Sequence, residues 1–123
     1  MTLIEAINRI DSLKPNTYTP QEKISWLSDL DGIIKCEIID THEGSESVSF
    51  SGYEPETPLD TVLLVPPPYD DVYIKWLEAQ MDYVTGETSR YENSMLMYNT
   101  AFSTFKRYYN RTHMPKGSSI KFF

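Results

Sequence analysis

The feature that most constrains the fold is an aromatic seam in the last third of the chain. Apolar residues recur there at alternating steps of four and three, which is the repeat of one face of an α-helix. The seam consists of Tyr91, Met95, Tyr98, Phe102, Phe105 and Tyr109. It predicts one helix from about residue 88 to residue 111 whose aromatic face packs against other helices. Such a seam ordinarily fills the core of a helical bundle, so it does not require a cofactor.

Two helices are predicted upstream from their capping signals. Thr2 and Glu5 have the spacing of a capping box, which predicts a short helix ending before Pro15. Residues 19–22 read Thr-Pro-Gln-Glu and combine a cap, a proline at the first helical position and a glutamate at the third. Apolar residues then keep helical spacing to about Asp40, which predicts the end of the second helix.

A third helix is predicted to begin at Asp70 or Asp71 and to end at Gly86, with Val84 on its apolar face. The sequence therefore indicates a mainly α, four-helix bundle-like domain over residues 1–111. The residues that we expect to be largely buried between helices are Trp26, Leu27, Leu30, Ile34, Trp76, Leu77, Tyr98, Phe102 and Phe105.

Residues 41–68 interrupt the helical pattern with glycine, serine, proline and acidic residues. β-prone runs at 48–50 and 61–65 allow two short strands, so we expect a long acidic loop or a short β-hairpin inserted between the second and third helices. A non-helical stretch of this length in a small domain is commonly functional or mobile. We interpret it as a projecting arm, and the alternative is a loosely packed connection without a function.

Residues 112–123 are expected to form a C-terminal arm. Pro115 and Gly117 prevent continuation of the last helix. Lys116 and Lys121 are polar, whereas Ile120, Phe122 and Phe123 supply apolar groups. We therefore expect the arm to become ordered on a partner surface, with Phe122 and Phe123 as its anchors.

The distribution of charge separates an acidic middle from a basic end. The net charge of −7 opposes binding to phosphate backbones, so sequence-specific nucleic-acid binding is not expected. From Glu37 to Asp60 no lysine or arginine intervenes between the acids, and no acid follows Glu92. No segment has the length and apolar character of a signal peptide or a membrane span. The single cysteine, Cys36, favours a reducing, intracellular origin, and we expect it to be a small buried residue on a helix.

The sequence offers little for catalysis or metal binding. No phosphate-binding glycine loop, nucleophile elbow or zinc spacing occurs. Asp40, His42 and Glu43 come nearest to a metal cluster, but they stand at a helix end that leads into a loop, so neither a metal nor a cofactor is expected. His113 is interpreted as a hydrogen-bonding surface residue. We therefore do not expect an enzyme.

Three stretches carry a resemblance to a known class of proteins. They are WLSDLDGIIKCEIIDTHEG (26–44), LLVPPPYDDVYIKWLEAQMDYVTGE (63–87) and YNRTHMPKG (109–117). Their amino-acid sequences resemble that of a small structural protein of phages and prophages of Gram-positive bacteria. More loosely, the chain resembles the head-tail connector (adaptor) family. The resemblance implies a ring of identical subunits, with the phage portal and tail-completion proteins as partners. It also implies residence in the bacterial host cytoplasm during assembly and then in the virion.

The acidic middle and the basic end suggest how such subunits would meet, because a head-to-tail contact joins two different patches. The proposed interface consists of Glu43, Glu46, Glu54, Glu56, Asp60, Arg111, Lys116, Lys121, Phe122 and Phe123. Alternatives are an acidic regulatory inhibitor that mimics nucleic acid, and a generic protein-interaction module. The adaptor family does not require the three prolines 66–68 or the acidic stretch before them, so another head or tail completion role stays open. The sequence also leaves open the ring size, the identity of the partners and whether the isolated chain is a monomer.

Overall fold

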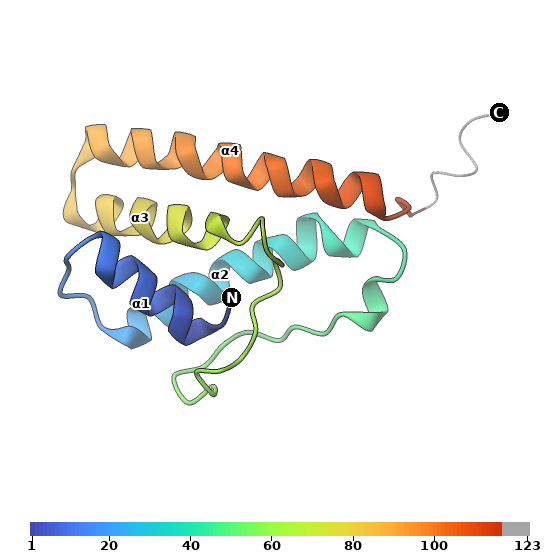
Figure 1. Ribbon diagram of the computed structural model, residues 1–123, viewed down its shortest axis with the longest axis horizontal. Coiled ribbons are helices and arrows are strands. Elements are labelled where there is room, and N and C mark those ends of the chain that lie inside the picture. The colour runs from blue at the N-terminus through green and yellow to red at the C-terminus, as the bar shows by residue number, and fades with distance from the viewer. Residues whose placement is uncertain (117–123) are drawn as a thin grey trace.

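The computed structural model describes residues 1–116, which contain four α-helices and two short 3-10 turns. The helices are α1 (Leu3–Leu13), α2 (Pro20–Glu37), α3 (Asp71–Thr85) and α4 (Thr88–Thr112), and the turns are η1 (Ile39–Thr41) and η2 (Ser45–Ser47). Figure 1 shows α3 and α4 side by side, with α1 and α2 on the other side of α3. In this part of the chain no helix has both the length and the apolar character needed to cross a membrane. The prediction of a mainly α, four-helix bundle-like fold is confirmed.

Both predicted capping boxes are present. The side chain of Thr2 accepts a hydrogen bond from the backbone N–H of Glu5, whose carboxylate accepts one from the N–H of Thr2 at 2.8 Å. Thr19 and Glu22 repeat this exchange at the start of α2. Because each exchange satisfies backbone N–H groups that the first helical turn leaves free, the two helix starts are determined locally.

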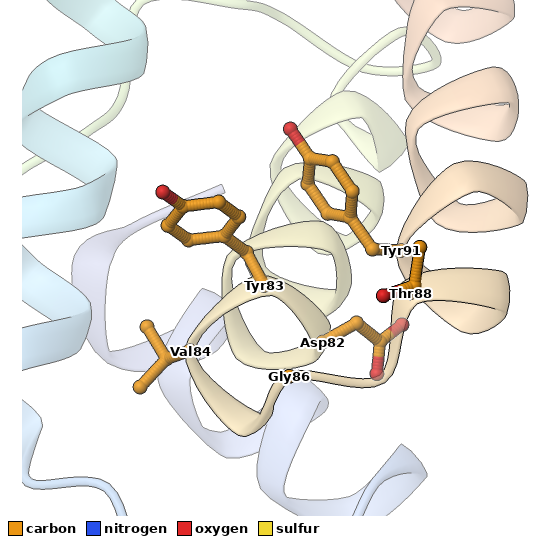
Figure 2. Close-up of a pocket in the computed structure, with 6 residues that line it drawn as sticks. All are labelled: Asp82, Tyr83, Val84, Gly86, Thr88 and Tyr91. Carbon is orange, nitrogen blue, oxygen red and sulfur yellow. The ribbon is translucent and has the colours of Figure 1, made fainter.

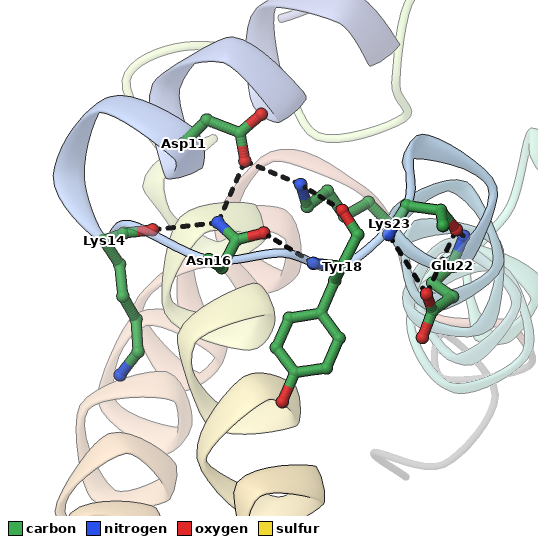
Figure 3. A network of polar contacts seen from close by, with 7 residues as sticks. Asp11, Lys14, Asn16, Tyr18, Glu22 and Lys23 are labelled. Carbon is green, nitrogen blue, oxygen red and sulfur yellow. Dashed lines mark hydrogen bonds and ion pairs between the residues drawn. The ribbon is translucent and has the colours of Figure 1, made fainter.

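The connection between α1 and α2 is held by a cluster of polar contacts, shown in Figure 3. Lys23 is buried, and its ammonium donates to the Asp11 carboxylate at 2.7 Å and to the Tyr18 carbonyl at 2.9 Å. The amide of Asn16 donates to the same carboxylate, and its oxygen accepts from the N–H of Tyr18. These contacts neutralise the buried ammonium and set the direction in which α2 leaves α1.

A tight turn joins α3 to α4. Gly86 ends α3 as predicted, with a left-handed φ of 82° that favours glycine. Its N–H donates to the carbonyl of Tyr83, and the N–H of Glu87 donates to that of Asp82. Because α4 begins at Thr88, the two helices lie antiparallel and α3 becomes the central helix of the molecule.

Most of the predicted core is buried, but three aromatic residues are not fully enclosed. Leu27, Leu30, Ile34, Leu77, Tyr98 and Phe105 are buried. Trp26, Trp76 and Phe102 are only half-buried, which corrects the expectation for them. Among the described helices α4 packs on α3 alone, so a side chain at the edge of that contact, such as Phe102, keeps one side in solvent.

Cys36 is exposed, so its predicted burial is wrong. The inner face of α2 in this region is formed by Ile34 and Ile38. Successive helical residues are rotated by roughly 100°, so a residue two positions from both of these points away from the core.

The segment between α2 and α3 neither forms a hairpin nor projects from the bundle. Within residues 1–116 no strand forms at 48–50 or 61–65, so of the two expected forms, a long loop or a short hairpin, the segment has the loop form. Instead, Leu63 and Val65 are buried among the helices, and the N–H of Leu3 donates to the carbonyl of Thr61 at 3.0 Å. The buried side chains of Leu63 and Val65 therefore hold this segment against the bundle. Its backbone hydrogen-bonds to α1 and not to a second strand.

A buried carboxylate, that of Asp31 on α2, fixes the same segment from inside. It accepts hydrogen bonds from the hydroxyl of Tyr53 at 2.5 Å, the hydroxyl of Tyr73 at 2.6 Å and the N–H of Leu64 at 3.2 Å. The Tyr73 hydroxyl in turn accepts from the N–H of Val65 at 2.7 Å. Burial raises the pKa of Asp31, although these three donors oppose the rise. The network joins α2, α3 and the connecting segment.

Candidate functional site

The acidic residues of the proposed interface occupy two separate places. Glu43 and Glu46 lie around the turns η1 and η2, next to the end of α4. Glu54, Glu56 and Asp60 lie in the segment that passes the start of α1, where the N–H of Ile4 donates to the carbonyl of Leu59 at 3.0 Å. All five side chains are exposed. The acids that follow one another in sequence therefore do not form one patch.

The basic residues lie at the far end of α4. Arg111 is in its last turn and Lys116 follows in the arm, and both are exposed. The arm begins as an extended segment paired with residues 41–43 of the same chain. The N–H of Glu43 donates to the carbonyl of Met114 at 2.8 Å, and the N–H of Lys116 donates to that of Thr41 at 3.0 Å. The arm therefore starts against the helical domain. Lys121, Phe122 and Phe123 lie outside the described residues.

His42 closes the contact between this acidic turn and α4. It is buried, with Nδ1 2.6 Å from the carbonyl oxygen of Ile38 and Nε2 2.8 Å from Oδ1 of Asn110. The ring of Tyr109 lies against His42 on one side and stacks on His113 at 3.8 Å. Because protein groups occupy both ring nitrogens of His42, its place in this structure is that of a link between η1 and α4.

The charged side chains of the proposed interface have no ion-pair partner within residues 1–116. The ion pairs in this part of the chain form elsewhere, for example between Lys35 and Asp40 and between Lys14 and Asp82. The unpaired side chains are Glu43, Glu46, Glu54, Glu56, Asp60, Arg111 and Lys116. They are therefore exposed charges that a second molecule can neutralise.

A second candidate surface, which the sequence did not indicate, lies at the α3–α4 turn. We call it the tip hollow, and Figure 2 shows its lining. It is lined by Asp82, Tyr83, Val84, Gly86, Thr88 and Tyr91 and has a volume of about 670 Å³. The rings of Tyr83 and Tyr91 stand 5.3 Å apart between centroids. Val84 was expected on the inner face of α3 but is exposed in its last turn, which corrects that expectation.

The floor of the tip hollow is held by Asp82, which joins three helices. Its carboxylate accepts hydrogen bonds from the ammonium of Lys14, at the end of α1, and from the hydroxyl of Ser94 on α4, both at 2.5 Å. Burial acts to raise the pKa of Asp82, but the contacts with Lys14 and Ser94 outweigh it and lower the pKa. Asp82 is therefore a charged group that is held by Lys14 and Ser94 and lies beside the apolar side chains of the hollow.

The side chains at these surfaces can make noncovalent contacts with another molecule. Over residues 1–116 no group of three or more His, Cys, Asp or Glu side chains is placed to hold a metal ion. The tip hollow offers aromatic and aliphatic surface, and the two charged regions offer unpaired carboxylates, a guanidinium and an ammonium. Comparisons with protein-family models, with curated proteins and with solved structures found no match to this chain.

Proposed function

We propose that this protein is a structural assembly subunit that joins copies of itself, and neighbouring proteins, through different surfaces. The supporting observation is the separation of exposed, unpaired charges of opposite sign: Glu54, Glu56 and Asp60 beside the start of α1, and Arg111 and Lys116 at the end of α4. A contact between two different patches repeats from one copy to the next and closes into a ring when the rotation permits.

The local geometry favours the acids at 54–60 as the partners of the basic end. Glu43 and Glu46 already lie on the turn that pairs with residues 114–116 of the same chain, so the basic end does not need a second molecule to meet them. The more distant acids have no such neighbour. We therefore place Glu54 and Glu56 of one copy against Arg111 and Lys116 of the next.

The resemblance of residues 26–44, 63–87 and 109–117 to small phage structural proteins supports assigning this role to a phage particle. In that assignment the chain is a head-tail adaptor subunit that docks on the portal ring and receives tail-completion proteins. It is made in the bacterial host cytoplasm and ends in the virion. Mass spectrometry of purified particles released from the host tests this assignment, and absence of the chain from the particles would contradict it.

The charge contact is tested by light scattering over a salt series with matched charge reversals. Exposed charges are screened over about 10 Å at 0.1 M salt and about 3 Å at 1 M, so assembly should decline as salt rises. Arg111→Glu should prevent assembly, whereas Arg9→Glu, an equal change at an exposed site on α1, should not. Mixing Arg111→Glu with a Glu54→Lys, Glu56→Lys variant should restore the contact. Assembly that is indifferent to salt and to these reversals would refute the charge contact.

A further inference from the structure

We infer that the tip hollow is the docking site for residues 117–123 of a second copy of this chain. This inference rests on the proposed self-assembly and names the surface and the segment that meet in it. Two observations lead to it: an apolar hollow at one end of α4, and an apolar terminal segment that starts from the other end.

The hollow is lined by exposed apolar side chains that adjoin one another. The side chains of Tyr83 and Val84 are 66% and 54% exposed although they are neighbours on the last turn of α3. Tyr91 stands beside Tyr83 and extends the same surface onto α4, as Figure 2 shows. The volume of the tip hollow, about 670 Å³, falls within the range of roughly 300 to 1,000 Å³ that is typical of binding pockets. Adjoining exposed apolar side chains of this kind commonly mark an interaction site.

Residues 117–123 cannot reach the hollow of their own molecule. The described chain ends at Lys116, beside Thr41 and at the C-terminal end of α4, whereas the hollow lies at the α3–α4 turn (Figure 1). From Tyr91 to Thr112 the helix rises about 32 Å, at roughly 1.5 Å per residue. The seven residues 117–123 span at most about 25 Å when fully extended, at roughly 3.5 Å per residue. A second copy must therefore supply the segment.

The chemistry of the segment fits that of the hollow. Ile120, Phe122 and Phe123 are its large apolar residues, and a phenylalanine ring packs well in a tilted or edge-to-face arrangement on tyrosine rings such as those of Tyr83 and Tyr91. The charges beside the hollow are mixed, with both Glu87 and Arg90 exposed, so aromatic contact rather than charge selects the occupant. Short docking segments usually derive most of their affinity from one or two such anchors.

The direction of the contact is consistent with head-to-tail assembly. Each copy offers the hollow at one end of α4 and the terminal segment at the other, so a copy can be donor and acceptor at once. A contact of this type is heterologous, and it repeats until a ring closes. It acts alongside the charge contact and uses different residues.

The test compares two adjacent double substitutions of similar exposure in the full chain. Tyr83→Ser with Val84→Ser alters the hollow, and Leu96→Ser with Met97→Ser is the control, since Leu96 and Met97 are 63% and 46% exposed on α4. A third variant, Phe122→Ser with Phe123→Ser, removes the proposed anchors. By sedimentation velocity the hollow and anchor variants should each associate at least tenfold more weakly than the unaltered chain, and the control should match the unaltered chain.

Mixing the hollow variant with the anchor variant gives the sharpest readout. One supplies an intact segment and the other an intact hollow, so the mixture should associate more strongly than either variant alone. If the anchor variant fails to associate but the hollow variant associates normally, the segment docks elsewhere and the inference is overturned. Normal association of both variants together with sensitivity to Arg111→Glu would also overturn it, and would leave the charge-driven assembly standing. An unaltered chain that stays monomeric at its highest soluble concentration would refute both.

Discussion

The hydroxyl of Tyr73 on α3 donates a hydrogen bond of 2.6 Å to the carboxylate of Asp31 on α2, and both side chains are completely buried. The same hydroxyl accepts from the N–H of Val65, so one oxygen connects two helices and the segment between them. A buried carboxylate is costly unless it is well hydrogen-bonded, and the Tyr53 hydroxyl and the Leu64 N–H supply the other donors. This arrangement explains how a long irregular segment keeps a defined position on a small bundle.

The first prediction concerns the Tyr73 hydroxyl. Tyr73→Phe deprives Asp31 of a donor and leaves the N–H of Val65 without its acceptor in a buried site. We expect a loss of about 1–3 kcal/mol in the free energy of unfolding, the range for a buried polar group left unsatisfied. Tyr53→Phe is the control, because this half-buried residue provides one donor and accepts nothing from the backbone there. Urea denaturation measures both, and an equal loss in the two variants would contradict the bridging role of Tyr73.

The second prediction is the pH dependence that Asp31 contributes. Burial raises its pKa in the folded protein above the ordinary value of 3.8, so the folded state binds more protons than the unfolded state between the two pKa values. Its contribution to stability is therefore fully present below the unfolded pKa and is lost as pH rises through the folded pKa. The stability of the unaltered chain relative to Asp31→Asn should fall as pH rises from 4 to 7. A relative stability that increases over this interval would show that the hydrogen bonds, not burial, determine the shift.

The third prediction separates two residues of the aromatic seam. Phe105 is 2% exposed and packs against Tyr69, Tyr108 and Tyr109, whereas Phe102 is half-buried beside Tyr98. Phe105→Ala should cost about 3–5 kcal/mol, the usual range for a buried phenylalanine, and Phe102→Ala should cost less. Chemical denaturation of the two variants decides the order, and the reverse order would mean that α4 packs on α3 through a different face.

Local signals explain why so much of the helical framework could be predicted. The capping boxes at Thr2 and Thr19 act within four residues, and Gly86 ends α3 through its own backbone conformation. The seam on α4 has the period of a helix, so its inner face could be read directly. The sequence pattern did not show that, among the described helices, α4 packs on α3 alone, and for that reason the burial of Phe102 was overestimated.

The contacts that could not be predicted join residues far apart in the chain. Asp31 follows Leu27 by four positions and precedes Ile34 by three, which puts a carboxylate on the inner face of α2, and this spacing was the available signal. Its partners Tyr53 and Tyr73 are distant in sequence, so the network depends on the fold. The acids likewise form one run in sequence but two groups in space, because the chain from η2 to residue 61 passes from the end of α4 to the start of α1.

The last prediction distinguishes the two parts of the C-terminal arm by truncation. Ending the chain after residue 112 removes the pairing of residues 114–116 with 41–43, including the hydrogen bonds from the N–H of Glu43 and of Lys116. A backbone hydrogen bond contributes about 0.5–1.5 kcal/mol net, so this truncation should lower the free energy of unfolding by about 1–3 kcal/mol. Ending the chain after residue 116 keeps that pairing, and because we place residues 117–123 in a second copy, the dilute monomer should unfold at an unchanged midpoint while self-association is lost. Circular dichroism melts and sedimentation of the two truncated chains check both statements. If removal of residues 117–123 alone lowers the unfolding midpoint of the monomer, these residues stabilise their own domain and are not free to fill the hollow of a neighbour.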